Sequence, residues 1–269
     1  MPDTIKETNF FGRDHWVDES RRITNESQYL DLFAHKPDAK RIGEKAPLLF
    51  YSSTAAKEIE AYNPHSDIII ALRNPVDMLY SWHRQCLTNY NETILDFAEA
   101  LAAEKDRARG LRIPSTATYP DGLQYVKVAS YYTNVKRYYD VFDQNHVHVI
   151  IYDDVVRDLP GVYRNLLEFL GVDSGFQPES FARWNEKVPL RSLRVRRFFH
   201  RWPKLESAVR KTIPKPMFRG IAKSIAALAT PERPPLSPEL RARLQHELSP
   251  DIEKISELLD RDLTHWCRD

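Results

Sequence analysis

An arginine and a serine eight residues apart are the first candidates for chemistry in this sequence. Arg73 directly follows an uninterrupted apolar run, residues 66–72, and Pro75 then opens a segment with helical spacing that carries Ser81. A guanidinium can hold a phosphate through two parallel hydrogen bonds, and a hydroxyl two helical turns later can add another. The same spacing also fits an arginine paired with a neighbouring carboxylate and a serine on a solvated helix surface.

These two side chains need a framework that places them at one edge of a sheet. Residues 66–72 (SDIIIAL) and 146–152 (HVHVIIY) are short β-branched runs, typical of strands buried on both faces of a parallel sheet. In open α/β sheets ligands bind outside the carboxyl ends of the strands, which is where Arg73 lies. The predicted helices are 54–62, 75–88, 122–142, 160–170 and 238–263. Strands that alternate with helices predict an α/β fold with a central parallel sheet.

Composition excludes several classes of protein. Of the 269 residues 42% are hydrophobic and 29% charged, so a core can form. The eight glycines form neither G-x-G-x-x-G nor G-x-x-x-x-G-K-[ST], which excludes a Rossmann dinucleotide site and a complete Walker-type loop. Cys86 and Cys267 form no disulfide framework, and we read no secretory signal or membrane-spanning run. From the two cysteines and the lack of such a signal we expect a cytoplasmic protein. The net charge of +1 gives no indication of a nucleic-acid partner, and we expect none.

Five segments resemble one enzyme family, in the same order along the chain. Residues 73–81 resemble the 3′-phosphate-binding element of sulfotransferases that use 3′-phosphoadenosine 5′-phosphosulfate (PAPS), with the closest similarity to the heparan-sulfate-type and bacterial carbohydrate branch. Residues 6–11 (KETNFF) resemble the Glu-x-x-Phe-Phe motif of that branch, and residues 44–47 (EKAP) resemble its Glu-Lys-x-Pro motif. Segments 152–171 and 236–266 are also similar to family members. The resemblance implies a three-layer α/β sandwich of the P-loop-NTPase-like sulfotransferase type.

The resemblance also implies a reaction and roles for five residues. A sulfuryl group would pass from PAPS to a hydroxyl or amine of a carbohydrate or glycolipid acceptor. Glu7 would be the catalytic base, an effect typically worth ~10²–10⁴-fold, and Lys45 would reach the acceptor side of the active site. Arg73 and Ser81 would anchor the 3′-phosphate of the donor. Arg191 falls where relatives close a basic loop over the same phosphate, and no metal is implied.

The sequence departs from the family pattern at its start. Members carry a strand, a loop containing Lys and Gly, and a helix before the Glu-x-x-Phe-Phe element, and these hold the 5′-phosphosulfate. This sequence begins at Met1, a few residues before that element. We therefore expect the chain as given to lack the first strand and the phosphate loop, and to be inactive or nearly so. The expected cause is a start codon assigned too late or a first segment left out, with Met1 internal to the whole protein.

The C-terminal part differs in character from the rest. We expect an α/β core over residues 1–190 and a basic, helical extension over residues 191–269 that packs on it. Residues 191–219 hold ten Lys/Arg and one acidic residue, with aromatic side chains between them. Such a segment can contact an anionic membrane or an acidic glycan, or it can form a solvated basic face. Residues 103–121, polar and interrupted by prolines, are expected to form a long surface excursion.

Other functions stay open on the sequence alone. One is a non-catalytic protein of the same scaffold that binds an anionic glycan or a membrane through residues 191–219. Another is a different nucleotide-phosphate enzyme, such as a small-molecule kinase, which the missing Walker lysine disfavours. Trp82 could lie against the donor nucleotide or the acceptor, and Phe181 or Trp184 could stack on the adenine, although packing is the simpler role for each. The remaining candidates are His146 and His148. We expect both to lie at a polar strand edge and not to bind a metal.

Overall fold

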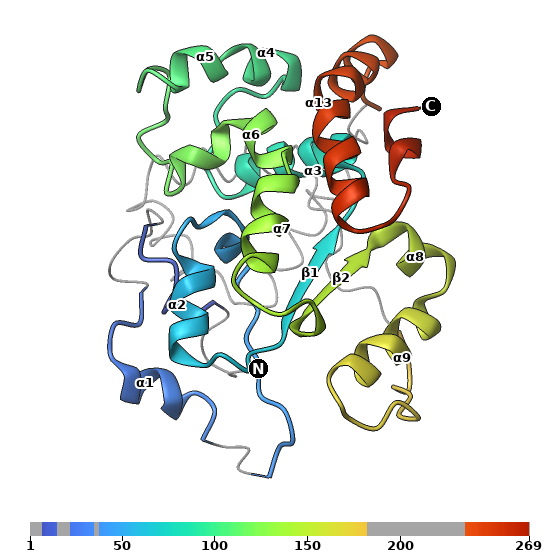
Figure 1. Cartoon of the computed structure of the whole chain (residues 1–269). Coiled ribbons are helices and arrows are strands. Elements are labelled where there is room, and N and C mark those ends of the chain that lie inside the picture. Colours follow the sequence, from blue (N-terminus) through green and yellow to red (C-terminus); the bar gives the residue numbers. More distant parts are fainter. Residues whose placement is uncertain (1–6, 15–21, 35–37, 182–234, 269) are drawn as a thin grey trace, which may run out of the picture.

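The computed structural model describes residues 7–14, 22–34, 38–181 and 235–268, and Figure 1 shows their arrangement. The helices and strands of this part are α1 Glu26–Asp31, α2 Ala55–Tyr62, β1 Ile68–Leu72, α3 Pro75–Thr88, α4 Phe97–Ala102, α5 Glu104–Arg107, α6 Tyr125–Ala129, α7 Tyr132–Tyr139, β2 Val147–Ile151, α8 Tyr152–Arg157, α9 Leu159–Phe169 and α13 Pro238–Leu258. Short 3₁₀ helices are η2 Pro47–Tyr51, η3 Pro120–Leu123, η4 Gln144–His146 and η5 Thr264–Cys267.

The two β-branched runs pair as parallel strands, as the sequence predicted. In the register of β1 and β2, Ile68 lies opposite Val147 and Leu72 lies opposite Ile151. Figure 1 shows the pair at the centre of the described elements, with their carboxyl ends at the same edge. Helices precede and follow each strand along the chain, so the α/β fold class is confirmed. Among the described helices, none is long and apolar enough to cross a bilayer.

Strand β1 is buried on one face and open on the other. Ile70 and Leu72 are 6% and 3% exposed and belong to the main core, whereas Ile69 is 45% exposed and Ala71 is also exposed. Successive side chains of a strand point to opposite faces, so one face of β1 is covered and the other faces solvent. The prediction that residues 66–72 are buried on both faces is therefore wrong for β1.

The C-terminal helix belongs to the same core as the sheet. Figure 1 shows α13 beside α3 and α7, and α13 contacts both helices. The apolar side chains of α13 face the core together with Trp266, which is 1% exposed. The buried apolar residues of α13 are Leu244, Leu248, Ile252 and Ile255. The proposed boundary after residue 190 falls outside the described residues and stays a prediction.

Three predicted helices match the structure closely, and a fourth is shorter. Helices 54–62, 75–88 and 160–170 correspond to α2, α3 and α9. The helix predicted over 238–263 ends at Leu258, because Asp260 adopts a left-handed conformation with φ of 47°. The backbone N–H of Arg261 then donates to the carbonyl of Ser256, as in a Schellman motif.

The helix predicted over 122–142 is broken in the structure. The chain forms η3, α6 and α7 instead, with Ser130 extended at ψ of 101° between the two α-helices. Asp251 of α13 accepts hydrogen bonds from the backbone N–H groups of Tyr131 at 2.6 Å and Tyr132 at 3.2 Å. The carboxylate thus accepts from backbone N–H groups that the break leaves without helical partners, and it stabilises the start of a new helix at this point. The prediction of one continuous helix was wrong.

The excursion predicted over residues 103–121 is anchored in the interior. It contains α5, whose Arg107 forms an ion pair with Glu92 at 2.8 Å, and both side chains are fully buried. Tyr125 donates its hydroxyl to the same carboxylate at 2.7 Å. The buried donors compensate the charge of Glu92, which would otherwise be costly to bury. The prediction of a surface segment is therefore wrong at Arg107, whereas Lys105 of the same helix is exposed.

Candidate functional site

Arg73 lies at the carboxyl end of β1, where the chain turns into α3. Asn74 caps the helix, because its side-chain oxygen accepts from the backbone N–H groups of Val76 at 3.0 Å and Asp77 at 3.4 Å, and Pro75 takes the first helical position. The guanidinium of Arg73 lies along the helix and donates through Nη2 to the carbonyl of Asp77. Its Nε is buried and has no hydrogen-bond partner among the described residues.

Ser81 lies on the same side of α3 as the arginine side chain. Residue 81 follows residue 77 by four positions, and residues four apart are neighbours on a helix surface. Arg73 already contacts the carbonyl of Asp77, and the Ser81 side chain is exposed. The structure therefore brings Arg73 and Ser81 to one side of α3, with Asp77 between them.

The tyrosine that precedes α7 as its N-cap residue holds the turn that carries Arg73. The hydroxyl of Tyr131 donates to the carbonyl of Arg73 at 3.1 Å, and the Tyr131 side chain is buried. Burial raises the pKa of Tyr131 well above its ordinary value, so the hydroxyl keeps its proton and remains a donor. The ring of Phe50 packs edge-on at 6.1 Å, which joins η2 to the same place. Sequence reasoning missed Tyr131, since nothing local relates it to residue 73.

Glu7 and Lys45 lie on two segments that one hydrogen bond joins. Thr8 donates its hydroxyl to the carboxylate of Glu44 at 2.5 Å, across 36 positions of sequence. Thr8 is buried, Glu7 is half-buried and Lys45 is exposed. Burial raises the pKa of Glu44, and the hydrogen bond from Thr8 opposes that shift. The structure thus brings together the two motifs predicted to act on the acceptor side.

The paired phenylalanines after Glu7 fix that segment in a small aromatic cluster. Phe10 stacks on Tyr29 with ring centroids 4.3 Å apart, and Phe11 packs edge-on against the same ring at 5.7 Å. Gly12 follows with a positive φ of 73°, and a Cβ there would lie 2.9 Å from the side chain of Leu49. Only glycine fits this close turn without a shift, so the chain leaves the cluster in a defined direction.

Asp14 ties the same segment to the start of α2. Its carboxylate accepts hydrogen bonds from the hydroxyl of Ser52, from the backbone and hydroxyl of Ser53 at 2.6 and 2.7 Å, and from the hydroxyl of Thr54 at 3.0 Å. Burial alone would raise the pKa of Asp14, but these hydrogen bonds outweigh it and hold the pKa well below its usual range. The sequence predicted Ser52 to Thr54 as capping residues without showing that Asp14 joins them.

Helix α7 connects the acceptor-side segments to the Arg73 turn. Arg137 donates to the carbonyl of Ser52 at 2.8 Å, and the hydroxyl of Tyr138 donates to the carbonyl of Leu49 at 2.9 Å. Tyr131, at the start of the same helix, holds the carbonyl of Arg73. One helix and its N-cap residue therefore contact both the end of η2, which follows Lys45 in the chain, and the turn that carries Arg73.

Comparison with known proteins decides the family. The family model described as sulfotransferase domain matches residues 5–223. The chain belongs to the sulfotransferase family. A solved structure described as a sulfotransferase from Alicyclobacillus acidocaldarius is similar, with a TM-score of 0.70 and 25% sequence identity, over 99% of this chain and 87% of that chain. No curated protein matches the sequence.

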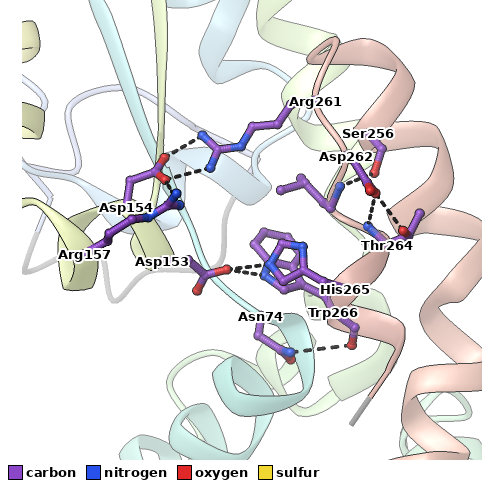
Figure 2. A network of polar contacts seen from close by, with 11 residues as sticks. Asn74, Asp153, Asp154, Arg157, Ser256, Arg261, Asp262, Thr264, His265 and Trp266 are labelled. Atoms are coloured by element: carbon purple, nitrogen blue, oxygen red, sulfur yellow. Dashed lines mark hydrogen bonds and ion pairs between the residues drawn. The ribbon is translucent and has the colours of Figure 1, made fainter.

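In this sulfotransferase the C-terminal segment contacts the start of α8, which directly follows β2. We call the contacts of Arg261, His265 and Trp266 with Asp153 and Asp154 the C-terminal lock. Figure 2 shows Asp153 accepting from the indole of Trp266 at 2.6 Å and contacting His265 at 2.9 Å. Asp154 accepts from the guanidinium of Arg261, with one contact at 2.8 Å. The side chain of Asn74 donates to the carbonyl of Trp266 at 3.5 Å. The lock therefore reaches the residue next to Arg73.

The other sequence candidates have structural partners or lie outside the described residues. Trp82 donates its indole N–H to the carbonyl of Gly122 at 2.7 Å, and Phe181 packs edge-on against Tyr163. Arg191, the basic segment 191–219 and Trp184 fall among residues that the structure does not describe. His146, predicted on the strand, lies in η4 just before it and contacts Asp67 at 2.8 Å, whereas His148 lies in β2 against the Phe169 ring. Within the described part of the chain no cluster of three or more His, Cys, Asp or Glu could hold a metal.

Proposed function

We propose that this sulfotransferase transfers a sulfuryl group from PAPS to a hydroxyl or amine of a carbohydrate or glycolipid acceptor. The observation that carries the proposal is the buried Nε of Arg73, which lies at the carboxyl end of a parallel strand without a partner among the described residues. A buried donor left unpaired is unfavourable by about 1–3 kcal/mol, so a bound anion would remove a penalty that the protein alone retains. Ligands of α/β sheets bind at this edge.

The donor side of the proposed site consists of Arg73 and Ser81. Arg73 forms no ion pair with a carboxylate of the described residues, so its charge is free for an anion. A 3′-phosphate placed against its guanidinium would accept from Nε and a terminal nitrogen together, and such charge-assisted pairs are the stronger class of hydrogen bond. The exposed hydroxyl of Ser81 would donate to the same phosphate. Arg191 remains a further proposed ligand.

The acceptor side of the proposed site consists of Glu7 and Lys45. As the acceptor oxygen or nitrogen attacks the sulfur, its proton would pass to the carboxylate of Glu7. The bond between sulfur and the bridging oxygen of the donor breaks, and its electron pair stays on the leaving phosphate. Lys45 would stabilise the charge that develops during transfer. The hydrogen bond between Thr8 and Glu44 supports this arrangement, since it holds the two segments beside each other.

Binding of adenosine 3′,5′-bisphosphate tests the donor side without requiring turnover. The ligand carries both donor phosphates and no sulfate, and its affinity is measured by titration calorimetry. Arg73→Ala should weaken binding by about tenfold or more, since hydrogen bonds to a charged group contribute about 1.5–3 kcal/mol. Arg157→Ala is the control, because Arg157 is exposed on α8 and its ion pair among the described residues is a local one with Asp154. Unchanged affinity in Arg73→Ala would contradict the proposed donor site.

A further inference from the structure

An acidic side chain lies between the two proposed phosphate ligands. Asp77 is one helical turn before Ser81, and its carbonyl already accepts from Arg73. Its carboxylate is 53% exposed and forms an ion pair with Arg241 of α13, with Nη2 and Oδ1 2.7 Å apart. An uncompensated carboxylate in this place would repel a phosphate bound between Arg73 and Ser81.

We infer that Arg241 is a positioning residue of the donor site, which neutralises Asp77 so that a 3′-phosphate can bind beside it. The inference rests on the proposed function, because it needs the 3′-phosphate to lie against Arg73 and Ser81. Arg241 acts through Asp77 in this account and does not itself contact the phosphate.

The dipole of α3 favours the negative charge of Asp77, whereas the dipole of α13 does not favour the positive charge of Arg241. Asp77 lies in the first turn of α3, where a negative charge is favoured by the helix dipole. Arg241 lies in the first turn of α13, where a positive charge is disfavoured for the same reason. The helix dipole therefore does not favour a positive charge at position 241, and the described ion pair of Arg241 is with Asp77.

The core holds Arg241 in place independently of this ion pair. Ser237 caps α13 by accepting from the backbone N–H of Leu240 at 3.2 Å. Leu240 packs against the main core, and Leu244 is fully buried one turn later. An exposed ion pair adds little to stability. Removing the Arg241 side chain should therefore change the charge beside the donor site while the fold is maintained.

A comparison of two ligands isolates the 3′-phosphate. Adenosine 3′,5′-bisphosphate and adenosine 5′-phosphate differ only in that group, so the ratio of their dissociation constants measures its contribution. Arg241→Ala should weaken the bisphosphate by about three- to tenfold and leave the monophosphate unchanged. The loss should shrink as salt is raised from about 50 mM to 500 mM, because the charges are solvent-exposed. Arg243→Ala, on an exposed position of the same helix, is the matched control.

The decisive variant combines Arg241→Ala with Asp77→Asn. Without the carboxylate nothing remains to neutralise, so the double variant should bind the bisphosphate as tightly as the wild type. If the double variant is as weak as Arg241→Ala, the arginine contacts the phosphate directly and the inference is wrong. An Arg241→Ala variant with wild-type affinity for both ligands would also overturn it.

Arg73→Ala in the same titrations separates this inference from the proposed function. If Arg73→Ala loses affinity and Arg241→Ala does not, the donor site stands and only the role of Arg241 fails. If Arg73→Ala binds both ligands normally, the proposed donor site fails, and the role of Arg241 fails with it.

Discussion

One hydroxyl joins the two segments that carry the proposed acceptor-side residues. Thr8 donates to Glu44, so the backbone next to Glu7 is tied to the backbone next to Lys45. Thr8 is 1% exposed, so its hydroxyl is shielded from water. A misplacement of a catalytic group by about 1 Å can lower the rate by about 10²-fold, so the position of a proton acceptor has to be fixed. We therefore regard Thr8 and Glu44 as the support of the proposed base.

Replacing Glu7 by Gln tests the proposed base. The amide keeps the shape of the side chain but cannot take a proton. In a form of the protein that includes the family's 5′-phosphosulfate loop, sulfate transfer from PAPS should therefore fall by about 10²-fold or more. The affinity for adenosine 3′,5′-bisphosphate should stay within about twofold, since Glu7 is placed on the acceptor side. Glu168→Gln, an exposed position on α9, is the control. Equal turnover in Glu7→Gln and wild type would remove Glu7 from the mechanism.

The start of α7 is the element that relates the donor side to the rest of the fold. Asp251 caps it from α13, and Tyr131 reaches from it to the carbonyl of Arg73. Burial raises the pKa of Asp251, although the hydrogen bonds from Tyr131 and Tyr132 favour its charged form. A shift of α7 would therefore move the turn that aims the guanidinium.

Tyr131→Phe tests whether this contact positions Arg73. The substitution keeps the ring in the core and removes a single hydrogen bond, so the free energy of unfolding should fall by about 1 kcal/mol. Affinity for adenosine 3′,5′-bisphosphate should fall by about three- to tenfold, while affinity for adenosine 5′-phosphate should not change. Tyr132→Phe, the next residue, is the control. A loss of stability without any change in the affinity ratio would mean that Tyr131 only supports the fold.

At the scale of the whole described structure, the C-terminal segment after α13 packs on the main core. Trp266 is buried in the main core and is held by Asp153, while Arg261 binds Asp154 from the turn after α13 (Figure 2). The segment therefore connects the end of β2 with the start of α3, two places that are distant in sequence. Because Asn74 contacts Trp266, the lock also supports the helix start beside Arg73.

Acid should loosen this lock. The hydrogen bond from Arg261 is the main cause that lowers the pKa of Asp154 from its ordinary value of 3.8, and burial opposes it. A lowered pKa means that the unfolded chain binds the proton more readily than the folded protein. The stabilisation is therefore present above the ordinary value and is lost as the pH falls through the lowered one.

Asp154→Asn should reveal this titration. At pH 7 the variant should melt about 2–4 °C below the wild type, as expected for about 1 kcal/mol in a chain of this size. The gap should narrow as the pH falls from about 5 to 3, because the wild type loses the same contact. Melting is followed by circular dichroism, with Asp38→Asn as an exposed control. A constant gap over this range would show that the ion pair does not contribute to the acid sensitivity.

The elements that the sequence predicted correctly have local signals. Asn74 and Pro75 mark the start of α3, and Gly171 with φ of 63° marks the end of α9. The β-branched runs form strands because their side chains suit a pleated, half-buried surface. The motifs with Arg73 and Ser81 could likewise be located, since both residues lie on one strand-turn-helix unit.

What the sequence could not predict depends on distant partners. Asp251 permits a helix start at Tyr132, 119 positions away, so the periodicity of 122–142 concealed the break. Arg107 enters the interior because it donates to the carboxylate of Glu92 there, and Tyr125 donates to the same carboxylate. Tertiary packing decides which elements cover each face of β1, and no local sequence pattern indicates that. The contacts of Thr8 with Glu44 and of Asp77 with Arg241 also join residues that are distant in sequence.

A crystal structure with adenosine 3′,5′-bisphosphate would test the central claim most directly. We expect the 3′-phosphate at the carboxyl end of β1, with Nε of Arg73 and the hydroxyl of Ser81 within about 3 Å of its oxygens. Asp77 should keep its ion pair with Arg241 beside the bound phosphate. A nucleotide whose 3′-phosphate contacts neither Arg73 nor Ser81 would contradict the account.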